Sequence, residues 1–127
     1  MLEFVGLSRF LMKLQDLPAV IDINIQESLA RFSNFEPMYV KYLKRFVDEP
    51  TYGALLESIA AHDLKGIETN AHTLKGVAGN LGLTSLFNGF NDIVQAARQG
   101  DEAKALALCA AIDPVVKATR EALAQLN

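Results

Sequence analysis

Apolar residues between positions 64 and 81 recur at steps of 3, 4, 3, 4 and 3 residues. That spacing is the signature of one face of an α-helix, so it predicts a helix over 64–81 with a buried stripe. Gly82 follows the last apolar position and suits a left-handed C-terminal cap. The residues of the stripe are Leu64, Ile67, Ala71, Leu74, Ala78 and Leu81.

Two shorter helices are predicted near the N-terminus. Residues 5–16 form a short amphipathic stretch, and Pro18 breaks the pattern after it. Asn24 with Glu27 three residues later resembles a capping box, which predicts a helix over 25–32.

The segment from Pro37 to about residue 61 carries the next apolar face. Pro37 suits the first turn of a helix, where a missing backbone N–H costs nothing. Pro50 either kinks that helix or restarts it. The apolar positions are Val40, Leu43, Phe46 and Val47 before Pro50, and Leu55, Leu56 and Ile59 after it.

Two further helices are predicted towards the C-terminus. Thr84 can cap a helix over 85–99, and Asp101 opens the last helix. Pro114 interrupts the last helix, so either the helix kinks there or Asp113 caps a second piece that begins with Pro114.

Helices with short loops between them pack antiparallel. We therefore predict an all-α fold: an up-down-up-down antiparallel four-helix bundle with additional short N-terminal helices. The sequence shows no linker and no internal repeat, so we expect a single domain over 1–127. Within it, residues 1–20 would be an N-terminal helical extension and residues 24–126 the bundle.

Composition narrows the classes of function. The chain has 127 residues and a net charge of -3, and it lacks the basic patch that nucleic-acid binders carry. No apolar run reaches the ~20 residues of a membrane span, and the N-terminus lacks the features of a signal peptide. We expect a cytoplasmic protein, in which the single cysteine, Cys109, is a small core residue.

The phenylalanines are expected in the core, with no stacking platform for nucleic-acid bases. Phe87 and its neighbour Asn88, on the helix that follows 64–81, are also candidates to border a docking surface. The expected core phenylalanines are Phe32, Phe35, Phe46, Phe87 and Phe90.

Candidate chemistry lies on the polar face of helix 64–81. On a helical wheel His72 points away from the apolar stripe, and Lys75, Gly76 and Gly79 share its face. Glycine inside a helix costs ~1 kcal/mol relative to alanine. Two glycines beside an outward-facing histidine therefore suggest a surface that a partner approaches closely.

A neutral imidazole is a nucleophile near pH 7, and it can hold a phosphoryl group as a phosphoramidate. A lysine one turn away offers positive charge to the phosphate oxygens. No acid, base or metal site is needed on this chain if the partner supplies them.

Residues 71–82 read AHTLKGVAGNLG, and this segment resembles the signature of the histidine-containing phosphotransfer (HPt) domain family, which is close to A-H-x-L-K-G-x-(small)-x-x-(apolar)-G. Residues 42–46 resemble the family's second-helix segment. The likeness covers roughly residues 24–125.

The resemblance implies that His72 is the phosphoacceptor, through Nε2, and that Lys75 lies near the phosphate. It also implies that Gly76 and Gly79 let a receiver domain approach, and that Asn80 is a candidate contact to the phosphate or the partner. Glu68 and Thr69, one turn before the histidine, complete the expected docking surface.

The implied function is phosphorelay signalling, in which the chain exchanges a phosphoryl group with the aspartate of response-regulator receiver domains and has no kinase or phosphatase activity of its own. The expected partners are receiver domains and a hybrid sensor histidine kinase. No cofactor is expected on this chain, and Mg²⁺ is expected on the receiver. The start at Met1 favours a stand-alone carrier, which we expect to be a monomer.

Other functions stay open. His72 as the general base of an enzyme would need a pocket and a second acid or base, and the sequence offers no such cluster. A helical docking or scaffold protein without phosphotransfer is the other alternative. His62 is expected to be a solvated residue at a turn between helices, and its ten-residue separation from His72 argues against a shared metal site.

Overall fold

The computed structural model describes residues 12–127, and in that range it contains helices and no β-strand. The predicted all-α class is confirmed. The helices are the 3-10 helices η1 (Leu14–Ala19) and η2 (Phe46–Asp48), and the α-helices α2 (Ile25–Arg31), α3 (Glu36–Arg45), α4 (Pro50–Ala60), α5 (Leu64–Leu81), α6 (Thr84–Arg98) and α7 (Glu102–Leu123).

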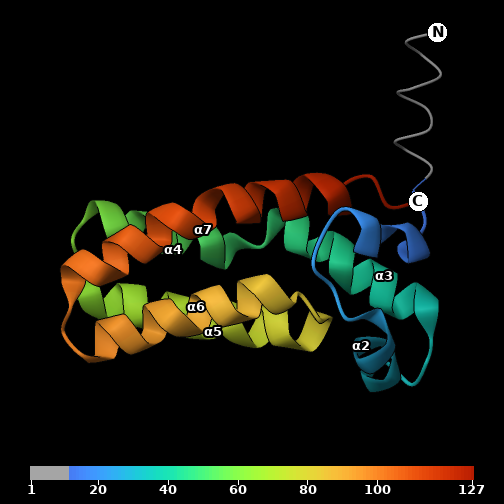
Figure 1. The fold of residues 1–127 in the computed structure, drawn as a ribbon, viewed down its shortest axis with the longest axis horizontal. Coiled ribbons are helices and arrows are strands. Elements are labelled where there is room, and N and C mark those ends of the chain that lie inside the picture. The colour runs from blue at the N-terminus through green and yellow to red at the C-terminus, as the bar shows by residue number, and fades with distance from the viewer. Residues whose placement is uncertain (1–11) are drawn as a thin grey trace, which may run out of the picture.

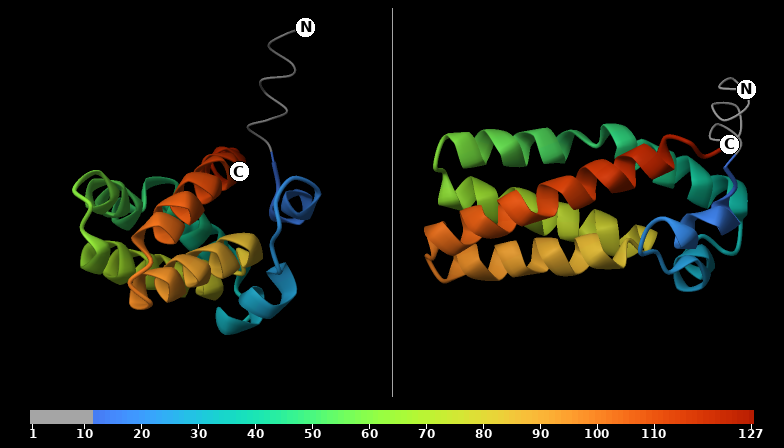
Figure 2. Two further views of the ribbon diagram at one scale, coloured as in Figure 1. Left: turned by 60° about the vertical axis from the view of Figure 1, so that its left-hand side comes forward. Right: turned by 45° about the horizontal axis from the view of Figure 1, so that its top comes forward.

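The bundle has the predicted up-down-up-down course (Figure 1). Helices α3, η2 and α4 follow one another along one edge and together form its first member. Helix α4 packs on α5, α5 on α6 and α6 on α7, and contacts between α7 and η2 close the bundle. Figure 2 shows η1 and α2 at one end of the bundle, outside its four long members.

The core lies between the four members of the bundle. The α5 stripe is buried except for Leu64, which is partly buried, as its period predicts. Of the five phenylalanines expected in the core, Phe46 and Phe90 are buried, and Phe32 and Phe87 are partly buried. Phe35 is 56% exposed, so its assignment to the core is wrong: it precedes the first turn of α3, where the chain turns outside the bundle.

The N-terminal prediction differs from the structure. Residues 5–11 of the expected helix 5–16 lie outside the described residues. The described part becomes helical only at Leu14, and Pro18 lies inside η1. Leu14 and Leu17 are buried, so η1 is held by these apolar contacts. Next to it the backbone N–H of Asn127 donates to the carbonyl oxygen of Met12 at 2.8 Å, which ties the two ends of the described chain together.

The two prolines inside the bundle act differently. Pro50 restarts the helix: α4 begins there, and the side chain of Glu49 caps it by accepting a hydrogen bond from the N–H of Thr51. Pro114 lies within the single helix α7, so the second piece capped by Asp113 does not exist. The Asp113 carboxylate instead accepts a hydrogen bond from the Tyr52 hydroxyl and pairs with Lys117.

Two smaller predictions are also corrected. Leu56 is 45% exposed, because it lies one residue beyond the buried Leu55 and a helix turns about 100° per residue. Thr84 is the first residue of α6 and not its cap, which is Leu83. The Thr84 hydroxyl donates to the carbonyl oxygen of Gly82 instead. Asp101 caps α7 as predicted, accepting from the N–H of Lys104.

Candidate functional site

Helix α5 carries the candidate site and has well-defined ends. The Asp63 side chain caps its start by accepting a hydrogen bond from the N–H of Gly66 at 3.0 Å. Gly82 ends it with φ +77°, the left-handed conformation that favours glycine. The helix spans Leu64–Leu81, the range predicted from the apolar period.

The His72 side chain is exposed on α5, and Leu74 and Ala78 are buried beneath that face. Within residues 12–127, no hydrogen bond or ion pair engages the imidazole. Lys75, one turn further on, is half-buried, and its Nζ lies 5.7 Å from the centroid of the Phe87 ring. The predicted exposure of His72 is confirmed, and the imidazole is free to meet a partner.

A surface groove of about 590 Å³ lies beside His72, between α2, α5 and α6. Several predicted residues line it together: His72, Lys75, Gly76, Gly79 and Asn80. Phe87 also lines it, as expected for a border residue, whereas Glu68, Thr69 and Asn88 do not.

The two glycines of this face differ in their surroundings. A Cβ built on Gly76 meets no atom within 4 Å. A Cβ on Gly79 would lie 2.9 Å from Cδ1 of Phe87, closer than real Cβ contacts. Gly79 therefore lets α6 pack against α5, a reason that the sequence alone does not reveal. No neighbouring side chain among the described residues requires a glycine at position 76.

Glu68 and Thr69 lie one turn before His72. The Glu68 carboxylate accepts a hydrogen bond from Nε of Arg98 at 3.1 Å, and its other oxygen lies 3.6 Å from Nζ of Lys65. The Arg98 hydrogen bond, followed by the charge of Lys65, holds the pKa of Glu68 below its ordinary value. Thr69 is exposed, and its carbonyl oxygen accepts a hydrogen bond from the Thr73 hydroxyl.

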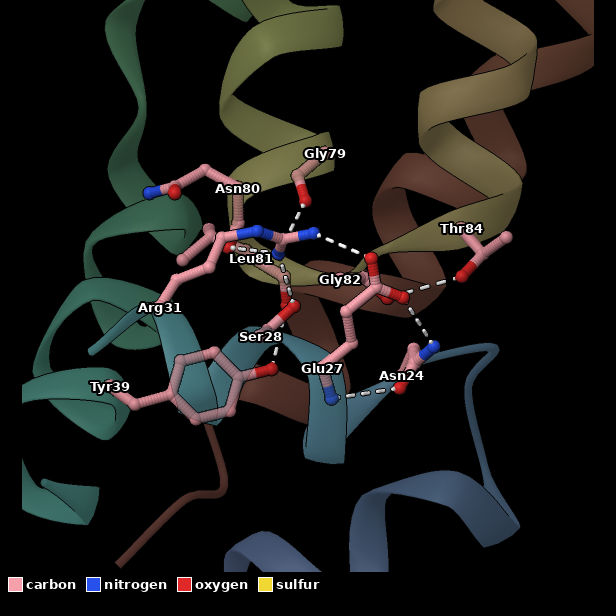
Figure 3. A network of polar contacts seen from close by, with 10 residues as sticks. All are labelled: Asn24, Glu27, Ser28, Arg31, Tyr39, Gly79, Asn80, Leu81, Gly82 and Thr84. Carbon is pink, nitrogen blue, oxygen red and sulfur yellow. Dashed lines mark hydrogen bonds and ion pairs between the residues drawn. The ribbon is translucent and has the colours of Figure 1, made fainter. Parts of the chain in front are cut away.

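Arg31 of α2 reaches the C-terminal end of α5 (Figure 3). Its Nη1 donates to the carbonyl oxygens of Gly79 at 3.1 Å and Asn80 at 3.2 Å, and Nη2 pairs with Glu27 at 3.1 Å. A cation at a helix C-terminus is favourable, because the carbonyls there lack partners within the helix. Sequence reasoning missed Arg31, since its partners lie 48 and 49 residues away and no local spacing marks them.

Two more residues satisfy the end of α5. The buried Tyr39 hydroxyl donates to the carbonyl oxygen of Leu81 at 2.7 Å, and the Asn24 N–H donates to that of Gly82 at 2.8 Å. Burial raises the pKa of Tyr39 to about 12, so its hydroxyl stays a donor at neutral pH. Every described carbonyl from residue 79 to residue 82 thus has a partner from α2, its cap or α3.

The capping box predicted at Asn24 is half confirmed. The Asn24 side chain accepts from the N–H of Glu27 at 3.2 Å, as a cap does. The Glu27 carboxylate, however, accepts from the side-chain amide of Asn24 at 3.0 Å and not from its backbone N–H. That N–H is already donated to Gly82, so the usual reciprocal bond is displaced.

The remaining candidate groups lie apart from the groove. No group of three or more potential metal ligands occurs among residues 12–127. His62 is exposed at the turn between α4 and α5, as expected, and its Nδ1 lies 3.1 Å from the Glu102 carboxylate. Cys109 is buried, and burial raises the pKa of its thiol to about 11, so it is not a nucleophile at neutral pH.

No helix among residues 12–127 combines the length and the apolar character needed to cross a lipid bilayer. In comparisons with known proteins, a family model described as the Hpt domain matches residues 41–127, well over half of the chain. No curated protein and no solved structure gives a significant match.

Proposed function

The chain belongs to the Hpt domain family, whose members are phosphocarriers of phosphorelays, and we propose that it accepts and donates a phosphoryl group at His72. The exchange partner would be the aspartate of a response-regulator receiver domain. The observation that carries this proposal is the exposed imidazole of His72, which no side chain of residues 12–127 engages and which borders a groove.

In the proposed step, Nε2 of His72 attacks the phosphorus of an aspartyl phosphate. The N–P bond forms, the P–O bond to the aspartate breaks, and the carboxylate leaves with the electron pair. The reverse step returns the group to an aspartate. Lys75 would stabilise the phosphate oxygens, because it lies three residues after His72, on the same face of α5. The Phe87 ring, 5.7 Å from the Lys75 ammonium, lines the same groove.

The docking surface would extend from His72 along α5. Gly76 leaves open space one turn beyond the histidine, and Gly79 and Asn80 continue the groove. Glu68 and Thr69 would extend the surface on the other side of His72. A receiver domain that brings its aspartate to His72 must cover this surface, so small side chains there reduce steric conflict.

In the proposed reaction, the metal ion, Mg²⁺, belongs to the receiver domain. No cofactor would be needed on this chain. A hybrid sensor histidine kinase would be the upstream source of the phosphoryl group, and the chain would act as a monomer. The carboxylate that lines the groove, Glu27, has both oxygens engaged, one by Arg31 and the other by Asn24.

Incubation with a radiolabelled, phosphorylated receiver domain tests the proposal. A carrier takes up label stoichiometrically while the receiver loses it, and the His72→Gln variant takes up none. A phosphotransfer-inactive scaffold would bind the receiver without becoming labelled, and an enzyme would release inorganic phosphate. Either result would refute the proposal.

A further inference from the structure

Glu68 lies four residues before His72 on α5. Side chains at this spacing are neighbours on a helix surface, with Cβ atoms about 5–6 Å apart. A free carboxylate at this place would put negative charge beside a histidine that carries a phosphoryl group of charge about -1.5 to -2. Like charges one turn apart repel, so a free Glu68 would disfavour phosphorylation.

The structure turns this carboxylate towards cations. Arg98, in the last turn of α6, donates from Nε to one Glu68 oxygen at 3.1 Å, and Lys65 lies 3.6 Å from the other. The Glu68 side chain is only 22% exposed, whereas that of Lys65 is 82% exposed. Arg98 is less exposed than Lys65, at 49%, and it donates a hydrogen bond, so it holds the carboxylate at the seam between α5 and α6 more firmly than Lys65 does.

A second carboxylate, that of Glu27, lines the groove beside His72 and is also paired with an arginine. The Glu27 carboxylate pairs with Arg31 at 3.1 Å. Glu68 is thus paired with an arginine of the following helix, whereas Glu27 is paired with an arginine of its own helix. Only Glu68, however, lies within one helical turn of His72 itself.

We propose that Arg98 is a positioning residue for phosphotransfer, which acts by neutralising Glu68 and by holding its carboxylate away from the phosphoryl group on His72. This inference rests on the proposed function. Under this proposal, the charge near His72 depends on Arg98 of α6, which lies 26 positions after the histidine in the sequence.

Phosphoramidate is a suitable probe, because it needs no protein partner. Nε2 of His72 displaces ammonia from phosphorus, so the N–P bond to the donor breaks as the bond to the imidazole forms. The labelled fraction is followed by intact-protein mass spectrometry at about 10 mM and at about 1 M salt, where the Debye lengths are about 30 Å and 3 Å.

We expect Arg98→Gln to be labelled about two- to five-fold more slowly than the wild type at low salt. The reason is that the unpaired Glu68 carboxylate would repel the doubly charged phosphoryl group at His72. At 1 M salt the difference should vanish. The double variant Glu68→Gln/Arg98→Gln should return to the wild-type rate, because it lacks the repelling charge. Lys117→Gln is the matched control: it removes one positive charge and one ion pair on α7, and should label like the wild type.

A wild-type rate for Arg98→Gln at low salt would overturn the inference. So would a slow rate that persists at high salt or in the double variant, since either result means that Arg98 acts through packing. Thermal melting of each variant checks folding, and the double variant loses the same ion pair as Arg98→Gln. If the wild type itself takes up no phosphoryl group at His72, the proposed function fails, and this inference fails with it.

Discussion

The ring of Phe87 occupies the space into which a side chain at residue 79 would project. A Cβ on Gly79 would lie 2.9 Å from Cδ1 and 3.1 Å from Cε1 of that ring. The same ring lies 5.7 Å from Nζ of Lys75. The missing side chain at residue 79 thus sets how closely α6 approaches α5, and with it the position of an aromatic ring beside the candidate phosphate-binding lysine.

Alanine substitutions at the two glycines of the His72 face should have different effects on stability. Gly76→Ala should raise the free energy of unfolding by up to ~1 kcal/mol, because alanine is the better helix former and the space is open. Gly79→Ala should be less stable than Gly76→Ala by about 1–3 kcal/mol, the cost of overpacking against Phe87. Urea denaturation of both variants measures this difference, and equal stabilities would show that the Phe87 ring moves aside freely.

Gly76→Ala should also be a poorer carrier. The added methyl group stands one turn from His72, on the surface that a receiver has to cover. We expect slower transfer from a phosphorylated receiver but unchanged labelling by phosphoramidate, which is too small to meet the methyl group. Wild-type transfer from the receiver would mean that Gly76 is not needed for docking.

His72→Gln should abolish phosphoryl uptake and leave the fold intact. The replaced side chain is exposed and makes no hydrogen bond to residues 12–127, so stability should change by no more than about 0.5 kcal/mol. Circular dichroism and labelling by a phosphorylated receiver check the two parts. Residual label would point to a second acceptor, with His62 as the first to replace.

Arg31→Ala should destabilise the protein by about 1–2 kcal/mol. The change removes charge-assisted hydrogen bonds to two carbonyls at the end of α5, at a site that is partly exposed. Arg45→Ala is a matched control, because Arg45 stacks on Tyr42 at the surface and should cost less than ~1 kcal/mol. Urea midpoints of the two variants should therefore differ, and similar midpoints would show that the carbonyls find other partners.

Asp113 should contribute to stability at neutral pH and not in acid. Its hydrogen bonds, first from Lys117 and then from Tyr52, hold the pKa of its carboxyl below the ordinary value. A lowered folded-state pKa means that the contribution is complete above the unfolded value of ~3.9 and is lost as the pH falls through the folded value. The gap in urea midpoint between wild type and Asp113→Asn should be present at pH 7 and shrink below about pH 3.9. A gap independent of pH would contradict this assignment.

The sequence predicted α5 closely because the signals for that helix are local. The apolar stripe repeats at helical spacing, and Gly82 takes the left-handed conformation that ends the helix. The exposure of His72 followed from the same period. A residue on the face opposite a buried apolar stripe points to solvent, so the exposure of the histidine could be predicted from the sequence.

What the sequence did not show depends on contacts between distant residues. Arg31 finds its carbonyl partners only after α2 packs against the end of α5, and the reason for Gly79 depends on a ring contributed by α6. Local patterns also overstated the core: Leu56 and Phe35 are apolar yet exposed, because burial is decided by the direction each position faces in the assembled bundle.

The hydrogen bonds at the end of α5 connect this helix to residues that precede the family match. The segment matched by the family model starts at residue 41, yet the partners of the carbonyls at residues 79–82 include Arg31, Tyr39 and Asn24, which all precede it. A fragment trimmed to the matched segment would leave these carbonyls to water, so the helix that bears His72 would fray from that end. The helix that bears His72 is therefore held in part by residues that precede the region of family likeness.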